Sequence, residues 1–136
     1  MKHTLLIITA LMLVVGCSKP IDGSTLVLKE QIIHTETYED GNIKSITYHK
    51  KSRTGIEKVK YEEYFENGQK YEEETYKDGK PDGKWTYWYG NGQKKEEGTY
   101  KDDKEDGLST YWYENGQKQW EATFKDGEQI GETKRY

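Results

Sequence analysis

The chain has 136 residues, of which 34% are charged and 32% are hydrophobic, and its formal net charge at pH 7 is −4. A chain of this length is typical of one domain. Low hydrophobicity with many charges favours disorder, but disordered chains lack aromatic residues, and here 13% of the residues are aromatic. An acidic chain gains nothing from counterion release, so we expect no nucleic acid partner.

Residues 1–16 have the pattern of an export signal. Lys2 supplies a positive start, residues 5–15 are apolar except for one threonine, and the small residue Gly16 precedes the only cysteine, Cys17. The apolar run is too short to span a bilayer comfortably, so we expect no permanent transmembrane helix. With a single cysteine the chain has no internal disulfide, and its stability must come from packing.

The segment Val14-Val15-Gly16-Cys17 resembles the bacterial lipobox. This resemblance implies cleavage before Cys17, lipidation of that residue, and a membrane anchor made of acyl chains. Residues 17–24 would form a lipidated tether, and the loss of Lys2 would change the net charge from −4 to −5. Because Ser18 follows the cysteine where aspartate would retain a lipoprotein at the inner membrane, the resemblance implies a cell envelope location, at the outer membrane if the bacterium has two membranes. The alternative is an unmodified cysteine in an ordinary secretory signal.

A period of 24 residues runs through the C-terminal half of the chain. We assign residues 64–136 to these repeats, the last of them truncated. Residues 25–63 are predicted to form capping strands and a degenerate first repeat, in which Gly41 matches Gly68 and Gly55 matches Gly83. Because Gly41 and Gly68 are 27 residues apart, we expect inserted residues in 56–60. The period is carried by three ladders: Gly68, Gly92 and Gly116; Gly83, Gly107 and Gly131; and Tyr76, Tyr100 and Phe124.

Turn residues divide each repeat into two strands. Asn-Gly at 67–68, 91–92 and 115–116 predicts two-residue type I′ turns, which need positive φ at both central positions. The segment Asp78–Gly83 predicts a longer turn. Residues 84–89 and 93–100 have the length of strands. Their alternation places Trp85, Tyr87 and Tyr89 on one face of the sheet and Trp88 on the other.

Aromatic residues must form the core of the repeats. Beyond Lys60 the aliphatic and alanine residues are only Leu108, Ala122 and Ile130, whereas sixteen aromatic residues lie between Tyr61 and Tyr136. A two-layer globule needs aliphatic side chains to fill its centre. We therefore predict an all-β fold, an elongated single-layer antiparallel meander of stacked β-hairpins. Its rings would form ladders at positions 64, 88, 112 and 136 and at 65, 89 and 113, with Gly98 and Ala122 leaving room for a neighbouring ring.

These repeats resemble the bacterial variant of the MORN repeat, named for membrane occupation and recognition nexus. The resemblance rests on tyrosine-rich strands, the Asn-Gly turn and the Lys-Asp-Gly-x-x-x-Gly connector. It covers residues 64–136 and, with fewer matching positions, residues 37–60. It implies a curved single-layer sheet of hairpins. Asp103 replaces the glycine found at Gly79 and Gly127, and we expect it to adopt positive φ without disturbing the turn.

No arrangement of residues supports catalysis, a metal site or a cofactor. Glu72 and Glu74 share a strand face at about 7 Å, a spacing compatible with paired acids. Later copies do not keep this pair, so we interpret it as a solvated face. The acidic segment 102–107 places Lys104 where a calcium loop needs a ligand, and His34 and His49 lack the spacing of a metal site. We predict a non-enzymatic protein without cofactor or metal.

Five aromatic residues are candidates for ligand binding: Trp85, Tyr87, Tyr111, Tyr113 and Trp120. Packing between repeats explains most of them, but an exposed row of rings would bind sugars, peptides or other chains. Trp120 has no aromatic counterpart at 72 or 96. The first hypothesis is protein binding or scaffolding by an envelope lipoprotein of unknown partner. The alternatives are carbohydrate or cell wall binding through exposed rings, and an antitoxin role, which the family resemblance suggests.

Overall fold

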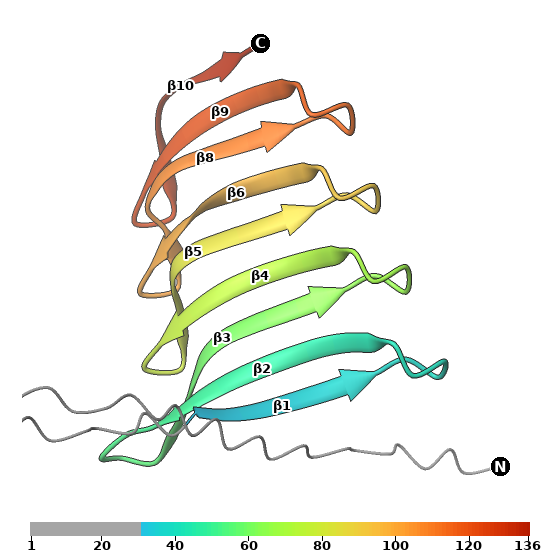
Figure 1. Ribbon diagram of the computed structural model, residues 1–136. Coiled ribbons are helices and arrows are strands. Elements are labelled where there is room, and N and C mark those ends of the chain that lie inside the picture. Colours follow the sequence, from blue (N-terminus) through green and yellow to red (C-terminus); the bar gives the residue numbers. More distant parts are fainter. Residues whose placement is uncertain (1–30) are drawn as a thin grey trace, which may run out of the picture.

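The computed structural model describes residues 31–136, so the predicted export signal and Cys17 lie outside the described residues. These residues form one open antiparallel sheet with its strands in sequence order (Figure 1). Every strand pairs with the next along the chain, except that β6 pairs with both the short β7 and β8. The strands are β1 (Gln31–Thr37), β2 (Ile43–Lys51), β3 (Ile56–Tyr64), β4 (Lys70–Lys77), β5 (Lys80–Trp88), β6 (Lys94–Lys101), β7 (Lys104–Glu105), β8 (Gly107–Trp112), β9 (Lys118–Lys125) and β10 (Glu128–Arg135).

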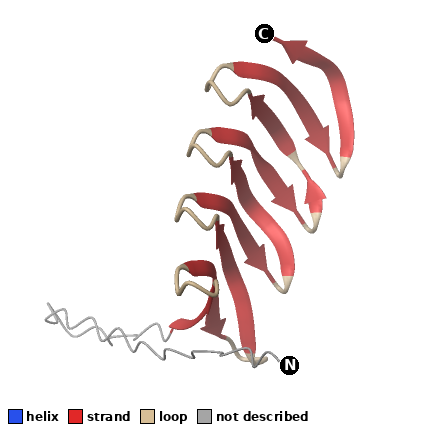
Figure 2. Ribbon diagram, turned by 90° about the vertical axis from the view of Figure 1, so that its right-hand side faces the viewer, coloured by secondary structure: helices blue, strands red, loops and turns tan. Residues whose placement is uncertain are grey.

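The sheet has a single layer. Figure 2 shows curved strands with the loops of successive hairpins stacked along one edge, and no second layer covers either face within the described part of the chain. The predicted all-β meander of stacked hairpins is therefore confirmed. β1 forms one end of the described sheet and β10 the other.

The two kinds of turn are the reverse of the prediction. At Asn67-Gly68 only the glycine has positive φ, 79°, and Phe65 N donates to Gln69 O at 2.8 Å. This is a three-residue loop, a type I turn closed by a glycine bulge. The two-residue turns lie instead at the Asp-Gly end, where Asp78 has φ 51° and its glycine also has positive φ. Asp103 adopts φ 70°, as expected for a residue in the glycine position.

The prediction of type I′ turns at Asn-Gly was wrong because the asparagine side chain forms hydrogen bonds within its own loop and to the next loop. Asn67 Oδ1 accepts a hydrogen bond from Gln69 N at 3.0 Å, which holds the loop in the right-handed conformation. Its amide then donates to Gly90 O in the next loop at 2.9 Å, and Asn91 repeats the bond to Glu114 O at 2.9 Å. Each of these two asparagines therefore ties its own loop to the following one.

The first repeat has a wider turn than the later copies. Gly55 has positive φ, as Gly83 does, but it closes a four-residue turn in which Ser52 N donates to Gly55 O at 2.7 Å. Gly83 lies inside β5, opposite Tyr100. Residues 56–60, where the insertion was expected, lie in β3, and the register with β2 shifts so that Val59 has no partner residue. Part of the added length therefore lies in the expected range, and the four-residue turn contains the rest.

The core is formed by broad rings lying over small residues. Trp85 is 4% exposed, and its indole lies against Gly98, where a methyl group would come within 2.8 Å of the ring. Ser109 and Ala122, which are 1% and 2% exposed, continue this row. The prediction that Gly98 leaves room for a neighbouring ring is confirmed.

The predicted ring ladders are connected differently. Trp88 and Trp112 do not stack on each other; Lys70 Nζ lies over the Trp88 ring and Lys94 Nζ over the Trp112 ring, each at 5.6 Å. At the second set of positions, Tyr89 lies in the loop after β5 and its hydroxyl donates to Trp112 O at 2.8 Å. Cations and hydroxyl groups therefore join successive repeats where the sequence predicted contacts between rings.

Gly98→Ala should destabilise the sheet. The new methyl group would lie 2.8 Å from the Trp85 ring and 2.7 Å from Ser109 Oγ. Overpacking of this kind costs about 1–3 kcal/mol in the free energy of unfolding, measurable by urea denaturation with tryptophan fluorescence. Gly90→Ala is the matched control, because a methyl group added there would meet no atom within 4 Å and the change should stay within about 0.5 kcal/mol. Equal losses in both variants would contradict the packing explanation.

Candidate functional site

Strand alternation divides the side chains between two faces of different character. One face, here called the aromatic–acidic face, carries Tyr61, Glu63, Glu72, Glu74, Tyr76, Trp85, Tyr87, Glu96, Tyr100, Glu105, Tyr111 and Trp120. The other, called the lysine–glutamate face, carries Lys60, Glu62, Lys70, Glu73, Thr86, Trp88, Lys94, Glu97, Thr110, Trp112, Lys118 and Glu121.

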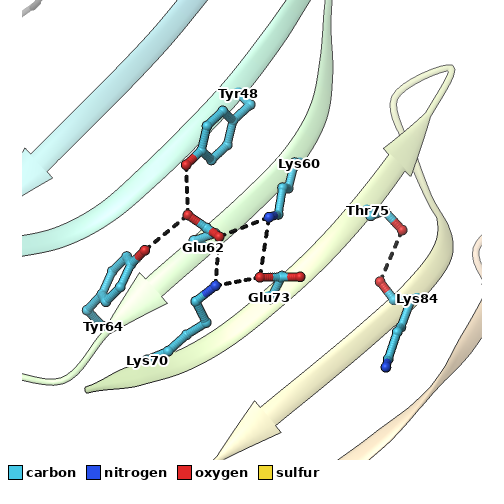
Figure 3. Close-up of polar contacts among 8 residues, drawn as sticks. All are labelled: Tyr48, Lys60, Glu62, Tyr64, Lys70, Glu73, Thr75 and Lys84. Carbon is cyan, nitrogen blue, oxygen red and sulfur yellow. Dashed lines mark hydrogen bonds and ion pairs between the residues drawn. The ribbon is translucent and has the colours of Figure 1, made fainter. Parts of the chain in front are cut away.

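Glu62 is the centre of a polar network on the lysine–glutamate face. It is 5% exposed and accepts hydrogen bonds from Tyr48 at 2.8 Å and Tyr64 at 3.0 Å. The ammonium groups of Lys60 and Lys70 lie 2.9 Å and 2.7 Å from its carboxylate. Figure 3 shows these four side chains converging on Glu62 from three strands. The buried charge is thus fully compensated.

The electrostatics of Glu62 follow from this network. Burial alone would raise the pKa of the carboxyl group, but the hydrogen bonds from Lys70, Lys60, Tyr48 and Tyr64 outweigh it and hold the pKa far below its ordinary value. The pKa of Tyr48 is raised to about 12, mainly by burial and further by the hydrogen bond that its hydroxyl donates to Glu62. Glu62 therefore stays ionised at neutral pH and acts as a structural acceptor.

A shorter form of this network recurs at intervals of 24 residues. The lysines at 70, 94 and 118 each pair with the glutamate three residues later, Glu73, Glu97 or Glu121. Lys118 Nζ also lies 5.4 Å from the Tyr136 ring, which repeats the contacts of Lys70 and Lys94 with tryptophan. On this face lysine and glutamate charges neutralise each other.

On the aromatic–acidic face, tyrosine hydroxyls hold the carboxylates. Tyr61 donates to Glu63 at 3.1 Å, and Tyr87 donates to Glu72 at 3.2 Å and to Glu74 at 3.3 Å. Burial and the nearby carboxylates Glu72 and Glu74 raise the pKa of Tyr87 far above its ordinary value, so this phenol remains a donor. Among the residues that the structure describes, none of the carboxylates of this face forms an ion pair.

Glu72 and Glu74 are close enough to share a proton. The pKa of Glu72 is raised to about 7, mainly by burial. The charge of Glu74 and a hydrogen bond between the two carboxyl groups raise it further. The structure confirms that the two side chains share one face, opposite Tyr87 and Trp85. A paired carboxyl with this pKa can hold or release a proton near neutral pH.

A lysine of the chain already occupies one part of this face. Lys58 Nζ lies 3.8 Å from the centre of the Tyr76 ring and 4.5 Å from that of Tyr61. Burial lowers the pKa of Lys58, whereas the charges of Glu74 and Glu72 oppose that change. The two rings and the two carboxylates thus surround an ammonium group.

The predicted ligand-binding residues are only partly brought together. Trp85, Tyr87, Tyr111 and Trp120 lie on the aromatic–acidic face, but Trp85 is buried and has no exposed ring to offer a ligand. Tyr111 and Trp120 stack on each other, with ring centres 3.6 Å apart at 16°. Tyr113 lies apart from the others, in the loop after β8, and is 46% exposed.

Sequence reasoning did not select Lys58, Glu96 or Glu105. Glu96 lies opposite Tyr111, and Glu105 lies opposite Tyr100. Alternation along β6 from Tyr100 places Glu96 on the same face, so a signal for Glu96 was available. Glu105 could not be placed in this way, because a longer turn was predicted where the structure has a two-residue turn at Asp102-Asp103.

A family model for the MORN repeat variant matches residues 53–78, 81–102 and 105–126. These three matches cover more than half of the 136 residues, and the chain belongs to this family. No curated protein sequence matches the chain. MORN repeats commonly take part in protein or membrane interaction, and the family is generally non-catalytic.

Two further observations apply to residues 31–136. They contain no group of three or more histidine, cysteine, aspartate or glutamate side chains arranged to hold a metal ion. Nor do they contain a helix with the length and apolar character needed to cross a membrane.

Glu62→Gln should lower the free energy of unfolding by about 2 kcal/mol at pH 7, because it leaves two lysines facing a neutral amide. Since the folded pKa of Glu62 is depressed, its contribution is present above pH 4.5 and is lost as pH falls toward the folded pKa. The difference between variant and wild type should therefore shrink in acid, as followed by urea denaturation at several pH values. Glu97→Gln is the control. The Glu97 side chain is 26% exposed in the wild type, so its replacement should lower the free energy of unfolding by less than about 1 kcal/mol.

Glu72→Gln should raise the free energy of unfolding above neutral pH, in contrast to Glu62→Gln, which should lower it. The folded pKa of Glu72 is raised from 4.5 to about 7, so wild-type stability falls as pH rises through this window and stays lower above it. The neutral glutamine removes that loss. Because the group is only half-buried, we expect a gain of about 1–2 kcal/mol at pH 8 and almost none at pH 4.5. A gain that is the same at both pH values would contradict a shared proton.

Proposed function

We propose that this protein is a non-enzymatic lipoprotein of the cell envelope whose repeat sheet binds another protein. The observation that carries the proposal is the aromatic–acidic face, where carboxylates are held by tyrosines and form no ion pairs among the described residues. Carboxylates without an ion-pair partner on an open sheet face suit contact with another protein better than internal stability. The family, which commonly takes part in protein or membrane interaction, supports the same conclusion.

The location rests on the sequence before the described residues. In the proposal, Cys17 carries the acyl chains, residues 17–24 separate the sheet from the membrane, and Ser18 directs the protein to the outer membrane of a bacterium with two membranes. The acidic character of the mature chain disfavours direct binding of the repeats to anionic phospholipid, since like charges repel. The lipid would anchor the protein and leave the sheet for its partner.

Metabolic labelling with a fatty acid analogue tests the anchor. The wild-type protein should incorporate the label, and Cys17→Ala should lose it, because the thiol is the proposed attachment point. A Tyr113→Ala variant, changed in an exposed loop far along the chain, should label like the wild type. Labelling that survives in Cys17→Ala would show that the anchor and the envelope location are wrong.

Capture from envelope extracts tests the binding activity, with the unlipidated sheet as bait. We expect retention of a protein that is absent from a bait unfolded by urea, and no retention of the bait on cell wall polysaccharide. Polysaccharide retention that Trp120→Ala abolishes would favour carbohydrate binding in place of this proposal. If the captured protein is a toxin, the sheet binds a protein as proposed, and the result supports the antitoxin hypothesis.

A further inference from the structure

The lysines that form ion pairs and the carboxylates that form none lie on opposite faces of the sheet. On the lysine–glutamate face, Lys60, Lys70, Lys94 and Lys118 all form ion pairs with glutamates of the same face. On the aromatic–acidic face, the glutamates accept hydrogen bonds from tyrosine and serine hydroxyls and form no ion pair among residues 31–136. One face is therefore internally neutral, and the other keeps negative charge that a partner could neutralise.

The lysine–glutamate pairs are the same in all three copies, whereas the carboxylate positions of the opposite face are not. Positions 70, 94 and 118 are all lysine, and positions 73, 97 and 121 are all glutamate. On the aromatic–acidic face, Glu72 is followed by Glu96 and Trp120, and Glu74 is followed by Gly98 and Ala122. Gly98 and Ala122 belong to the core beside the rings, but Glu72, Glu96 and Trp120 each lie opposite a tyrosine in the same sheet, so this position is free to serve recognition.

Lys58 shows what kind of group this face accommodates. Its ammonium lies over the rings of Tyr76 and Tyr61, at 3.8 Å and 4.5 Å, near Glu72 and Glu74. Rings beside carboxylates attract cations by both charge and the quadrupole of the ring. The intramolecular contact is a direct example of lysine recognition by this surface.

A similar group of residues occurs one repeat further on. Trp85 and Tyr100 take the positions of Tyr61 and Tyr76, with ring centres 5.8 Å apart. Glu105 lies opposite Tyr100, and the next strand places Tyr111 opposite Glu96. Neither glutamate forms an ion pair among the described residues. Because Trp85 is buried, Tyr100 and Tyr111 are the rings that this part of the face offers beside the two carboxylates, and no lysine of the described residues lies over them.

We propose that the aromatic–acidic face binds a lysine- or arginine-rich segment of the partner protein, with basic side chains lying over Tyr100 and Tyr111 and pairing with Glu96 and Glu105. This inference rests on the proposed function and names the chemistry of its partner. Lys58 fills the corresponding site of the preceding repeat, so the partner segment binds beside it and continues the same pattern of contacts. Charge complementarity favours a basic protein segment over an anionic membrane surface.

The test uses a short fluorescein-labelled peptide of alternating lysine and serine, with binding followed by fluorescence anisotropy at low ionic strength. The wild-type sheet should bind it, and a peptide of alternating glutamate and serine should not bind. The double variant Glu96→Gln/Glu105→Gln should weaken binding about tenfold or more, because both pairing carboxylates are lost. Thermal unfolding of the same sample checks that the sheet remains folded.

The matched control is Glu66→Gln/Glu114→Gln, which makes the same change in net charge at exposed loop positions. Its binding should change less than about twofold. Equal weakening by both double variants would reduce the effect to net charge and overturn the proposal, as would a wild-type sheet that binds no lysine peptide. Spermidine that displaces the peptide at equal concentration would assign the face to small cations and also overturn it.

The same variants separate this inference from the proposed function. If the wild-type bait and the Glu96→Gln/Glu105→Gln bait capture the same envelope protein equally well, the protein-binding function stands, but the assignment of binding to Glu96 and Glu105 is wrong. If the captured protein is lost only in that variant, both are supported. If the wild type captures no protein, the proposed function itself fails, whatever the peptide does.

Discussion

The absence of a second layer over the described sheet is the constraint on which the rest of its structure depends. A side chain of a single-layer sheet can be buried only by neighbours on its own face. Broad rings do this well because each one spans the gap of about 4.8 Å to the next strand. Trp85 covers Gly98, and Ser109 is almost completely buried although it is small and polar. The aromatic composition and the scarcity of aliphatic residues are consequences of this geometry.

The same constraint explains the role of lysine in the repeat. A lysine side chain has an apolar stem and a charged end, so it can cover a ring and still reach a carboxylate. Lys70 lies over Trp88 and pairs with Glu73, and Lys94 lies over Trp112 and pairs with Glu97. Two rows of residues thus supply burial and neutralise charge on the lysine–glutamate face. The carboxylates of the opposite face receive no such partners among the described residues.

The sequence predicted the period, the all-β class and the single layer, because glycines, turns and rings repeat together at positions that local chemistry explains. It placed Trp85 and Tyr87 on one face and Trp88 on the other, as observed. It failed on the turns, because the bonds of Asn67 to its own loop and to the next are tertiary contacts that propensity does not contain. It also missed Glu105, which the two-residue turn at Asp102-Asp103 places opposite Tyr100 where a longer turn was predicted.

A repeat array must satisfy similar packing requirements in each copy, so a residue that keeps its identity through the copies indicates a shared packing contact. Lys70 and Glu73 keep their identity through three copies, and their contacts are the ones that bury rings and neutralise charge. Glu72 does not, since Glu96 and Trp120 take its place, and burial raises the pKa of its carboxyl group, so its ionised form costs stability. Lys58 lies near Glu72 and Glu74, whereas Glu96 and Glu105 form no ion pair among the described residues. A cation from another molecule is therefore best placed at Glu96 and Glu105, and the functional specificity of this sheet should lie on that part of the aromatic–acidic face.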